Sequence, residues 1–288
     1  NSKLKVNFDY FIERRKDILT NRKVLPTYLA ANLPIANIGK VDNKGYELSV
    51  NWRDRIHYFR YHIGFNLAYY DYMRKTGKPV GQQMGYKYDG FFSEEDVAKY
   101  ETERGKSIPD HGTGYIPKPG DVKYKDLNND HKIDQYDVAA IGYPVYPLLT
   151  GGINLGFSYK GFDFSMTWSG ATKVSRLLDD IFREPFGATD SRSLMKYMID
   201  DMWTPEKGNS AKAPAISFTN KVKNVEIGYN FSKKILSKIN IGSLRVFATG
   251  YNLLTLDKLK IVDPESRPNG NAMYPVVMVI NMGLKVGF

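Results

Sequence analysis

The segment YKDLNNDHKIDQYDV, residues 124–138, places oxygen-bearing side chains at alternate positions of one short stretch. Oxygen ligands at positions 1, 3, 5, 7, 9 and 12 of a curled loop converge on one calcium ion, with position 7 contributing its backbone carbonyl. This spacing predicts a structural calcium site, and a solvated acidic turn without metal is the alternative. The predicted ligands are, in order, Asp126, Asn128, Asp130, the carbonyl of Lys132, Asp134 and Asp137.

Two residues of this stretch depart from the usual calcium-loop pattern. Position 6, where glycine normally makes the sharp turn, is His131, which enters the left-handed backbone region at some energetic cost. Position 12 is Asp137, whose short side chain needs a tighter wrap than glutamate for bidentate binding. The predicted role is to hold a long loop in shape, since nothing in the sequence indicates an open coordination position facing a substrate.

The remaining candidates for catalysis are weak. The four histidines show no metal-ligand spacing, and acidic pairs such as Glu94 with Glu95 are typical of solvated loops and helix caps. Serines lack the surroundings of a nucleophile elbow, and the glycine runs lack the strand-to-helix setting of a phosphate loop. We therefore predict that the protein is not an enzyme.

Composition limits the partners and the class of protein. The formal net charge is +10, but Lys and Arg are scattered and form no compact basic run or nucleic-acid motif, so we predict no nucleic-acid partner. No segment approaches the roughly 20 apolar residues of a membrane helix. The absence of cysteine excludes a disulfide framework without fixing the compartment.

Alternation of apolar and polar residues recurs along the chain and places successive side chains on opposite faces of a sheet. Two hairpin turns are predicted within it, at RDRI (residues 53–56) and at YKGF (residues 159–162). The pattern predicts about eight strands, within residues 4–13, 45–52, 59–69, 153–159, 162–168, 225–231, 244–252 and 276–288.

The predicted connections alternate between short and long, which is typical of an outer-membrane barrel. A soluble β-sandwich also alternates in and out, but apolar faces rich in aromatic residues and such long loops favour the barrel. Short amphipathic helices are predicted at residues 174–182 and 193–203. The long connections are predicted at residues 15–42, 75–149, 173–217 and 253–274.

An ordered set of motifs resembles a known family, the SusC/RagA-like TonB-dependent outer-membrane transporters. The resemblance covers essentially the whole chain, and His131 stands where the family usually has glycine. The motifs, in order, are LPIANIGKVDNKGYELSVNW, GDVKYKDLNNDHKID, MWTPEKGNSAKAP, VKNVEIGYNF, LRVFATGYNLLTL and YPVVMVINMGLKVGF.

The resemblance implies an all-β fold, an antiparallel transmembrane β-barrel of about 22 strands. Residues 1–288 would form its C-terminal portion, with residues 75–149 and 173–217 as long external loops and the plug domain outside this chain. We also expect the chain to begin inside a fold, as a fragment or a processed piece.

The same resemblance implies a function in the bacterial outer membrane, the import of oligosaccharides or peptides. The implied partners are a SusD-like lipoprotein lid, the remaining barrel and plug, outer-membrane lipid, and TonB, which would act through the missing N-terminal part. The alternative is a soluble, secreted, calcium-stabilised β-rich protein that binds glycans.

Overall fold

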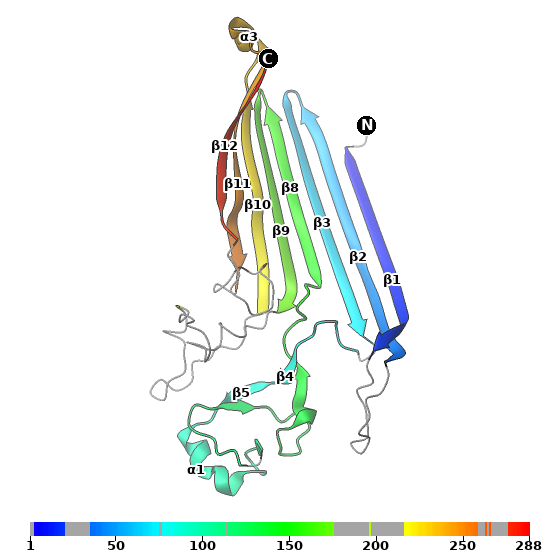
Figure 1. The fold of residues 1–288 in the computed structure, drawn as a ribbon, viewed down its shortest axis with the longest axis vertical. Coiled ribbons are helices and arrows are strands. Elements are labelled where there is room, and N and C mark those ends of the chain that lie inside the picture. The colour runs from blue at the N-terminus through cyan, green and yellow to red at the C-terminus, as the bar shows by residue number, and fades with distance from the viewer. Residues whose placement is uncertain are drawn as a thin grey trace.

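An antiparallel sheet of eight strands dominates the computed structural model (Figure 1). The structure describes residues 3–20, 35–74, 77–112, 114–175, 216–258 and 276–288, together with Lys196, Asp263 and Glu265. All neighbouring strands of this sheet pair antiparallel, so the predicted all-β antiparallel fold is confirmed. In sheet order the strands are β1 (Leu4–Thr20), β2 (Ala36–Ile56), β3 (Phe59–Arg74), β8 (Leu149–Tyr159), β9 (Phe162–Ser175), β10 (Ile216–Asn230), β11 (Ser243–Asp257) and β12 (Val279–Gly287).

Long and short connections lie at opposite ends of the sheet. Two-residue turns join β2 to β3 and β8 to β9, while a connection carrying helix α3 (Lys233–Leu236) joins β10 to β11. Figure 1 shows α3 and the C-terminus at one end, and beyond the other the small elements β4 (Met84–Tyr86), β5 (Tyr88–Phe91) and α1 (Glu94–Glu103). None of the helices that the structure describes has the length and apolarity needed to cross a membrane.

Several predicted boundaries are wrong. A turn was predicted at residues 53–56, but strand β2 continues through them and the turn is His57–Tyr58. His57 lies in the left-handed region (φ 54°), which suits a tight hairpin. Strand β9 includes Val174 and Ser175, where a helix was predicted. The rest of that helix lies outside the described residues, as does the predicted helix at 193–203 except Lys196, which is helical.

Strands β1 and β2 also extend into the predicted connection at residues 15–42. The alternation fades there, with Arg14, Arg15, Lys16 and Asp17 in succession, but the pairing of β1 with β2 continues as far as Thr20. A strand segment exposed to water on both faces need not alternate apolar and polar residues. The alternation therefore predicted only the part of each long strand that has one apolar face.

One face of the sheet is apolar and exposed. On β1 the residues Leu4, Val6, Phe8, Tyr10 and Ile12 are all about half exposed or more, and Phe8 reaches 64%. Antiparallel register sets apolar residues of β2 opposite them, so the apolar surface runs across strands. No second apolar layer covers the sheet in the part of the chain that the structure describes, where the buried apolar side chains are Phe92, Tyr100, Val222 and Leu236.

The opposite face carries small and charged residues. A Cβ atom on Gly156 would lie 2.1 Å from the His62 ring, so only glycine leaves room for that imidazole. Arg245 of β11 reaches across Gly228 of β10 to Asp163 of β9 (2.5 Å), and it also pairs with Glu226 (2.6 Å). Charged pairs therefore tie three strands together on this polar face.

The two faces of β12 predict opposite responses to an added charge. We expect Met282→Lys to destabilise the barrel by about 2–4 kcal/mol, because Met282 is 86% exposed on the apolar face and a lysine there would have to enter lipid. Asn281→Lys, one residue away on the polar face, is the matched control and should cost much less. Urea unfolding of the full-length protein in lipid vesicles measures both, and equal losses would contradict the assignment of faces.

Candidate functional site

The described part of the β3–β8 connection, residues 77–112 and 114–148, forms a small folded body beyond the end of the strands (Figure 1). Its helix α1 begins at Ser93, whose hydroxyl accepts the Asp96 N–H (3.0 Å) while the Asp96 carboxylate accepts the Ser93 N–H (3.0 Å), a reciprocal cap. Phe92 and Tyr100, each 1% exposed, form its apolar centre. Its elements are β4 (Met84–Tyr86), β5 (Tyr88–Phe91), α1 (Glu94–Glu103), β6 (Val122–Tyr124), η1 (Gln135–Asp137) and β7 (Val138–Ala140).

The first half of the predicted calcium loop, residues 126–137, is bent around the carboxylate of Asp126. Asp126 Oδ1 accepts the Asn129 N–H (2.6 Å), and Oδ2 accepts the His131 N–H (2.8 Å). Asn129 and His131 both take left-handed backbone conformations, with φ of 59° and 63°. His131 therefore adopts the turn that glycine usually supplies at this position, and two hydrogen bonds to Asp126 hold that turn.

The middle of the loop is tied to the segment after α1. Asn128 Nδ2 donates to Asp130 Oδ2 (3.0 Å), and Asp130 Oδ1 accepts the Lys132 N–H (2.9 Å). The Asp110 N–H donates to the His131 carbonyl (2.9 Å), and the Asp110 carboxylate pairs with Arg104 (2.8 Å). The hydrogen bond from Arg104 lowers the pKa of Asp110 below its usual value, which keeps this ion pair charged.

Asp137 closes the loop by joining its two ends. Its carboxylate is fully buried and accepts the Leu127 N–H at Oδ1 (2.8 Å) and the Asp134 N–H at Oδ2 (2.8 Å). Burial alone raises the pKa of Asp137, but the backbone N–H groups of Asp134, Leu127 and Asn128 more than offset burial, and the net pKa is lowered. Asp134 accepts the Tyr136 N–H (2.8 Å) and begins η1.

The six predicted ligands therefore lie on one loop, in the order that calcium coordination requires. Their carboxylates are turned toward backbone amides. Over the described ranges, no three or more His, Asp or Glu side chains gather closely enough to hold a metal ion. Calcium binding stays a prediction, which the backbone conformation of the loop supports.

His111 organises an aromatic cluster beside this loop, and no pattern in the sequence indicated this cluster. Its Nδ1 donates to the Pro109 carbonyl (2.9 Å) and its Nε2 accepts the Tyr124 N–H (3.3 Å), so both ring nitrogens are used. Burial lowers the pKa of His111, which favours the neutral ring that these two bonds require. An imidazole engaged in this way supports a loop and has no nitrogen left for proton transfer.

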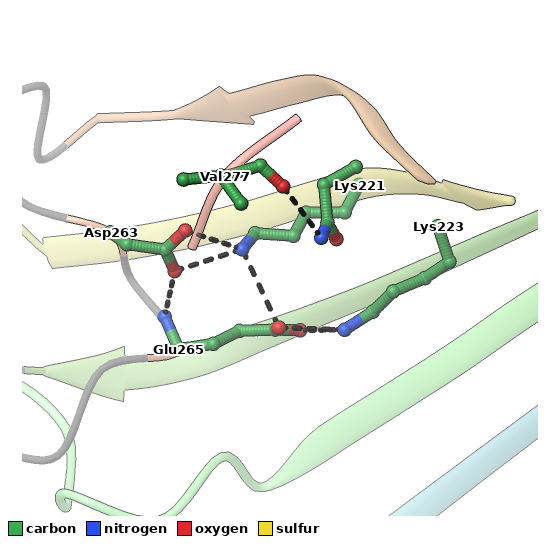
Figure 2. A network of polar contacts seen from close by, with 6 residues as sticks. Lys221, Lys223, Asp263, Glu265 and Val277 are labelled. Atoms are coloured by element: carbon green, nitrogen blue, oxygen red, sulfur yellow. Dashed lines mark hydrogen bonds and ion pairs between the residues drawn. The ribbon is translucent and has the colours of Figure 1, made fainter. Parts of the chain in front are cut away.

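A second polar cluster lies where the β11–β12 connection meets the sheet (Figure 2). The Lys221 side chain is 1% exposed, and its Nζ bonds to both carboxylate oxygens of Asp263 (2.8 Å each) and, more weakly, to Glu265 (3.4 Å). Lys223 Nζ bonds to both oxygens of Glu265 (2.5 and 2.6 Å), and the Glu265 N–H donates to Asp263 (2.8 Å). Two lysines of one strand thus anchor two acidic residues of a distant connection.

A bulge in β10 brings both lysines to the polar face. The pairing of β10 with both neighbours shifts between Val222 and Asn224. Lys223 is the extra residue relative to β9, whereas in the pairing with β11 the extra residue lies on β11. The sequence held a signal for this bulge that we did not use. The apolar residues are at an even position at Val222 and at odd positions from Val225 onward, so the alternation changes phase between them.

The eight-stranded sheet, its uncovered apolar face and its long connections at one end define a class of protein, the membrane β-barrels. The family described as "TonB dependent receptor-like, beta-barrel" matches residues 1–253, and the chain belongs to that family. The resemblance drawn from the sequence motifs is thereby confirmed. The family is one of receptors and transporters, so the prediction that the protein is not an enzyme is also confirmed.

Known relatives agree in fold and in family. TonB-dependent receptor P3 of Formosa agariphila is 26% identical over 344 residues, covering 100% of this chain and 32% of that protein. TonB-dependent receptor P39 of the same organism is 23% identical over 359 residues, covering 99% and 34%. The chain therefore spans about a third of the length of these relatives.

Solved structures of similar fold come from the RagAB system. The RagAB peptide importer in its open-open state superposes with a TM-score of 0.70 at 18% identity, covering 100% of this chain and 33% of that one. The closed-closed state gives a TM-score of 0.66 at 19% identity, covering 99% and 34%. At this identity the likeness shows the fold alone.

The buried Lys221 predicts a strong effect of removing its partner. We expect Asp263→Asn to destabilise the folded protein by about 3 kcal/mol, because it removes the carboxylate nearest the buried Lys221 and leaves only the longer contact to Glu265 (3.4 Å). Replacing both residues, by Lys221→Met with Asp263→Leu, should recover most of that loss. Urea unfolding in detergent micelles measures each variant.

The control for this experiment is an exposed ion pair. Glu95→Gln removes the partner of Lys99 on α1, where both side chains are more than half exposed, and should cost less than about 1 kcal/mol. A loss for Asp263→Asn no larger than for Glu95→Gln would show that the Lys221 cluster is not an anchor.

Proposed function

We propose that this chain forms part of the barrel wall of an outer-membrane, TonB-dependent importer of oligosaccharides or peptides that works with a SusD-like surface lipoprotein. The observation that carries the proposal is the division of one continuous sheet into an exposed apolar face and a polar, charged face. Membership of the TonB-dependent receptor family supports the proposal that TonB energises the import. The fold shared with the RagAB peptide importer supports the proposal that the cargo is an oligosaccharide or a peptide.

In this proposal each part of the chain has a distinct physical task. The apolar face lies against lipid, where every backbone N–H and C=O must already be paired, as strand pairing provides. The polar face lines the interior, and the cluster of Arg245, Asp163 and Glu226 stiffens it across three strands. The long connections shape the external mouth, and the folded β3–β8 connection offers a surface for the lipoprotein lid.

Import is tested with the whole protein, because the chain spans a third of its relatives' length. Deleting its gene should abolish uptake of fluorescent oligosaccharide or oligopeptide pools by intact cells, and a protonophore should do the same in the parent strain. Glucose uptake, which needs no such importer, is the control. Recovery of the protein in the soluble secreted fraction, with unchanged uptake, would instead support the soluble glycan-binding alternative.

We also propose that residues 126–137 bind one calcium ion that holds the β3–β8 connection in shape. The donor set is four carboxylates, one amide and the Lys132 carbonyl, the hard oxygen ligands that calcium prefers. The left-handed turn at His131 and the closure of the loop by Asp137 support the proposal, because both fold the loop back on itself. When bound, the ion would neutralise the clustered carboxylates.

Calcium removal gives a direct test. We expect a chelator to increase proteolysis within residues 75–149, with protection restored by calcium and not by the same concentration of magnesium, which prefers a stricter octahedral shell. Asp130→Ala should make cleavage insensitive to calcium, whereas Asp89→Asn, an exposed acid outside the loop in the same connection, should not. Cleavage that is the same with and without calcium would exclude the site.

A further inference from the structure

A hollow of about 380 Å³ opens between β4, β6 and the segment that follows α1. The rings of Tyr86, Tyr124, His111 and Tyr115 follow one another around it, with neighbouring centroids 5.3 Å apart for Tyr86 and Tyr124, 6.1 Å for Tyr124 and His111, and 6.4 Å for His111 and Tyr115. Asp121 supplies a carboxylate to the same wall. We call this the tyrosine hollow.

Tyr86 and Tyr115 are each 37% exposed, although Phe92 and Tyr100 next to the hollow are almost fully buried. The body of the connection is therefore packed, and the rings around the hollow are left accessible. Binding pockets combine an apolar lining with a few placed polar groups, and they start at about 300 Å³. A volume near that limit suits one ring of a larger ligand.

The polar groups of the hollow are arranged to accept hydrogen bonds. Asp121 Oδ2 accepts both the Tyr115 hydroxyl (2.8 Å) and the Lys118 N–H (2.9 Å), which fixes the carboxylate, and no described residue donates to Oδ1. Burial, followed by the bond to Asp121, raises the pKa of Tyr115, which keeps this phenol protonated as a donor. A ligand hydroxyl is the matching partner for Oδ1.

Among the residues that the structure describes, none with a cationic side chain lines the hollow. Its residues are the four rings, Asp121, Val122 and Ile133, and His111 is held neutral by its two hydrogen bonds. The nearby ammonium of Lys123 is bound to Asp96 (2.9 Å). Sulfated or uronic sugars and peptide carboxylates would meet Asp121 with no cationic side chain among these lining residues.

Backbone pairing also disfavours a peptide in this position. One edge of β6 pairs with β5, and the Tyr124 N–H, which an added strand would need, is donated to His111 Nε2. A sugar ring needs no such edge, because it presents C–H groups on its faces to aromatic rings and hydroxyls around its rim to acceptors.

We propose that the tyrosine hollow is a binding subsite for one ring of a neutral oligosaccharide, with Tyr86 and Tyr124 against its face and Asp121 accepting a hydroxyl. This inference deepens the proposed import function and rests on it for the delivery of the sugar. It assigns the subsite to neutral glycans rather than to acidic glycans or peptides.

Saturation-transfer NMR and calorimetry on the full-length protein in detergent micelles test the subsite without any transport. The probes are a neutral set (cellotetraose, maltotetraose, xylotetraose and mannotetraose), an acidic tetragalacturonate and a tetra-alanine peptide. We expect at least one neutral probe to bind, and Tyr86→Ala to weaken it by about tenfold, which corresponds to about 1.4 kcal/mol. Asp121→Asn should weaken it less.

Tyr136→Ala is the matched control, because Tyr136 is 70% exposed in the same connection and does not line the hollow. Wild-type proteolysis patterns identify the variants that remain folded. Failure of all four neutral probes, equal binding of tetragalacturonate, or binding of tetra-alanine alone would each overturn the subsite. Failed binding with intact oligosaccharide uptake would contradict the subsite and leave the import function supported. Binding without uptake would support the subsite and contradict the import function.

Discussion

Backbone hydrogen bonding between neighbouring strands is the constraint on which the whole structure depends. A segment surrounded by lipid has no water to satisfy its N–H and C=O groups, so each strand must be paired along both edges. Within the described chain β1 and β12 each pair on one edge only, and the strands between them pair on two. The side chains are then free to differ by face, apolar toward one side and small or charged toward the other.

That freedom explains how much of the fold could be predicted. The apolar residues of β1 and β12 recur every second position, so the strands, their order and the ends with long connections followed from the sequence. The alternation failed to predict the structure where a strand no longer has one apolar and one polar face. Arg15, Lys16 and Asp17 interrupt the alternation of β1, and the bulge at Lys223 shifts the phase of β10, so neither the strand ends nor the bulge followed from simple alternation.

The candidate sites divide in a similar way. The predicted calcium loop is local, so it could be proposed from the spacing of Asp126 to Asp137 alone, and the left-handed turn at His131 could be anticipated. The tyrosine hollow and the Lys221 cluster are assembled from segments far apart in the chain, Tyr86 with Tyr124 and Lys221 with Asp263. Such contacts depend on how the long connections fold onto the strands and onto themselves. The spacing of residues along the chain does not predict this.

The central claim is that one face of the wall meets lipid and the other an aqueous interior. The chain has no cysteine, so single cysteines can be introduced along residues 279–287 and spin-labelled in the full-length protein in lipid vesicles. The account predicts that accessibility to oxygen and to a water-soluble nickel chelate alternates with a period of two residues, oxygen being highest at Ile280, Met282 and Leu284. Uniform accessibility to the nickel chelate along the strand would contradict it.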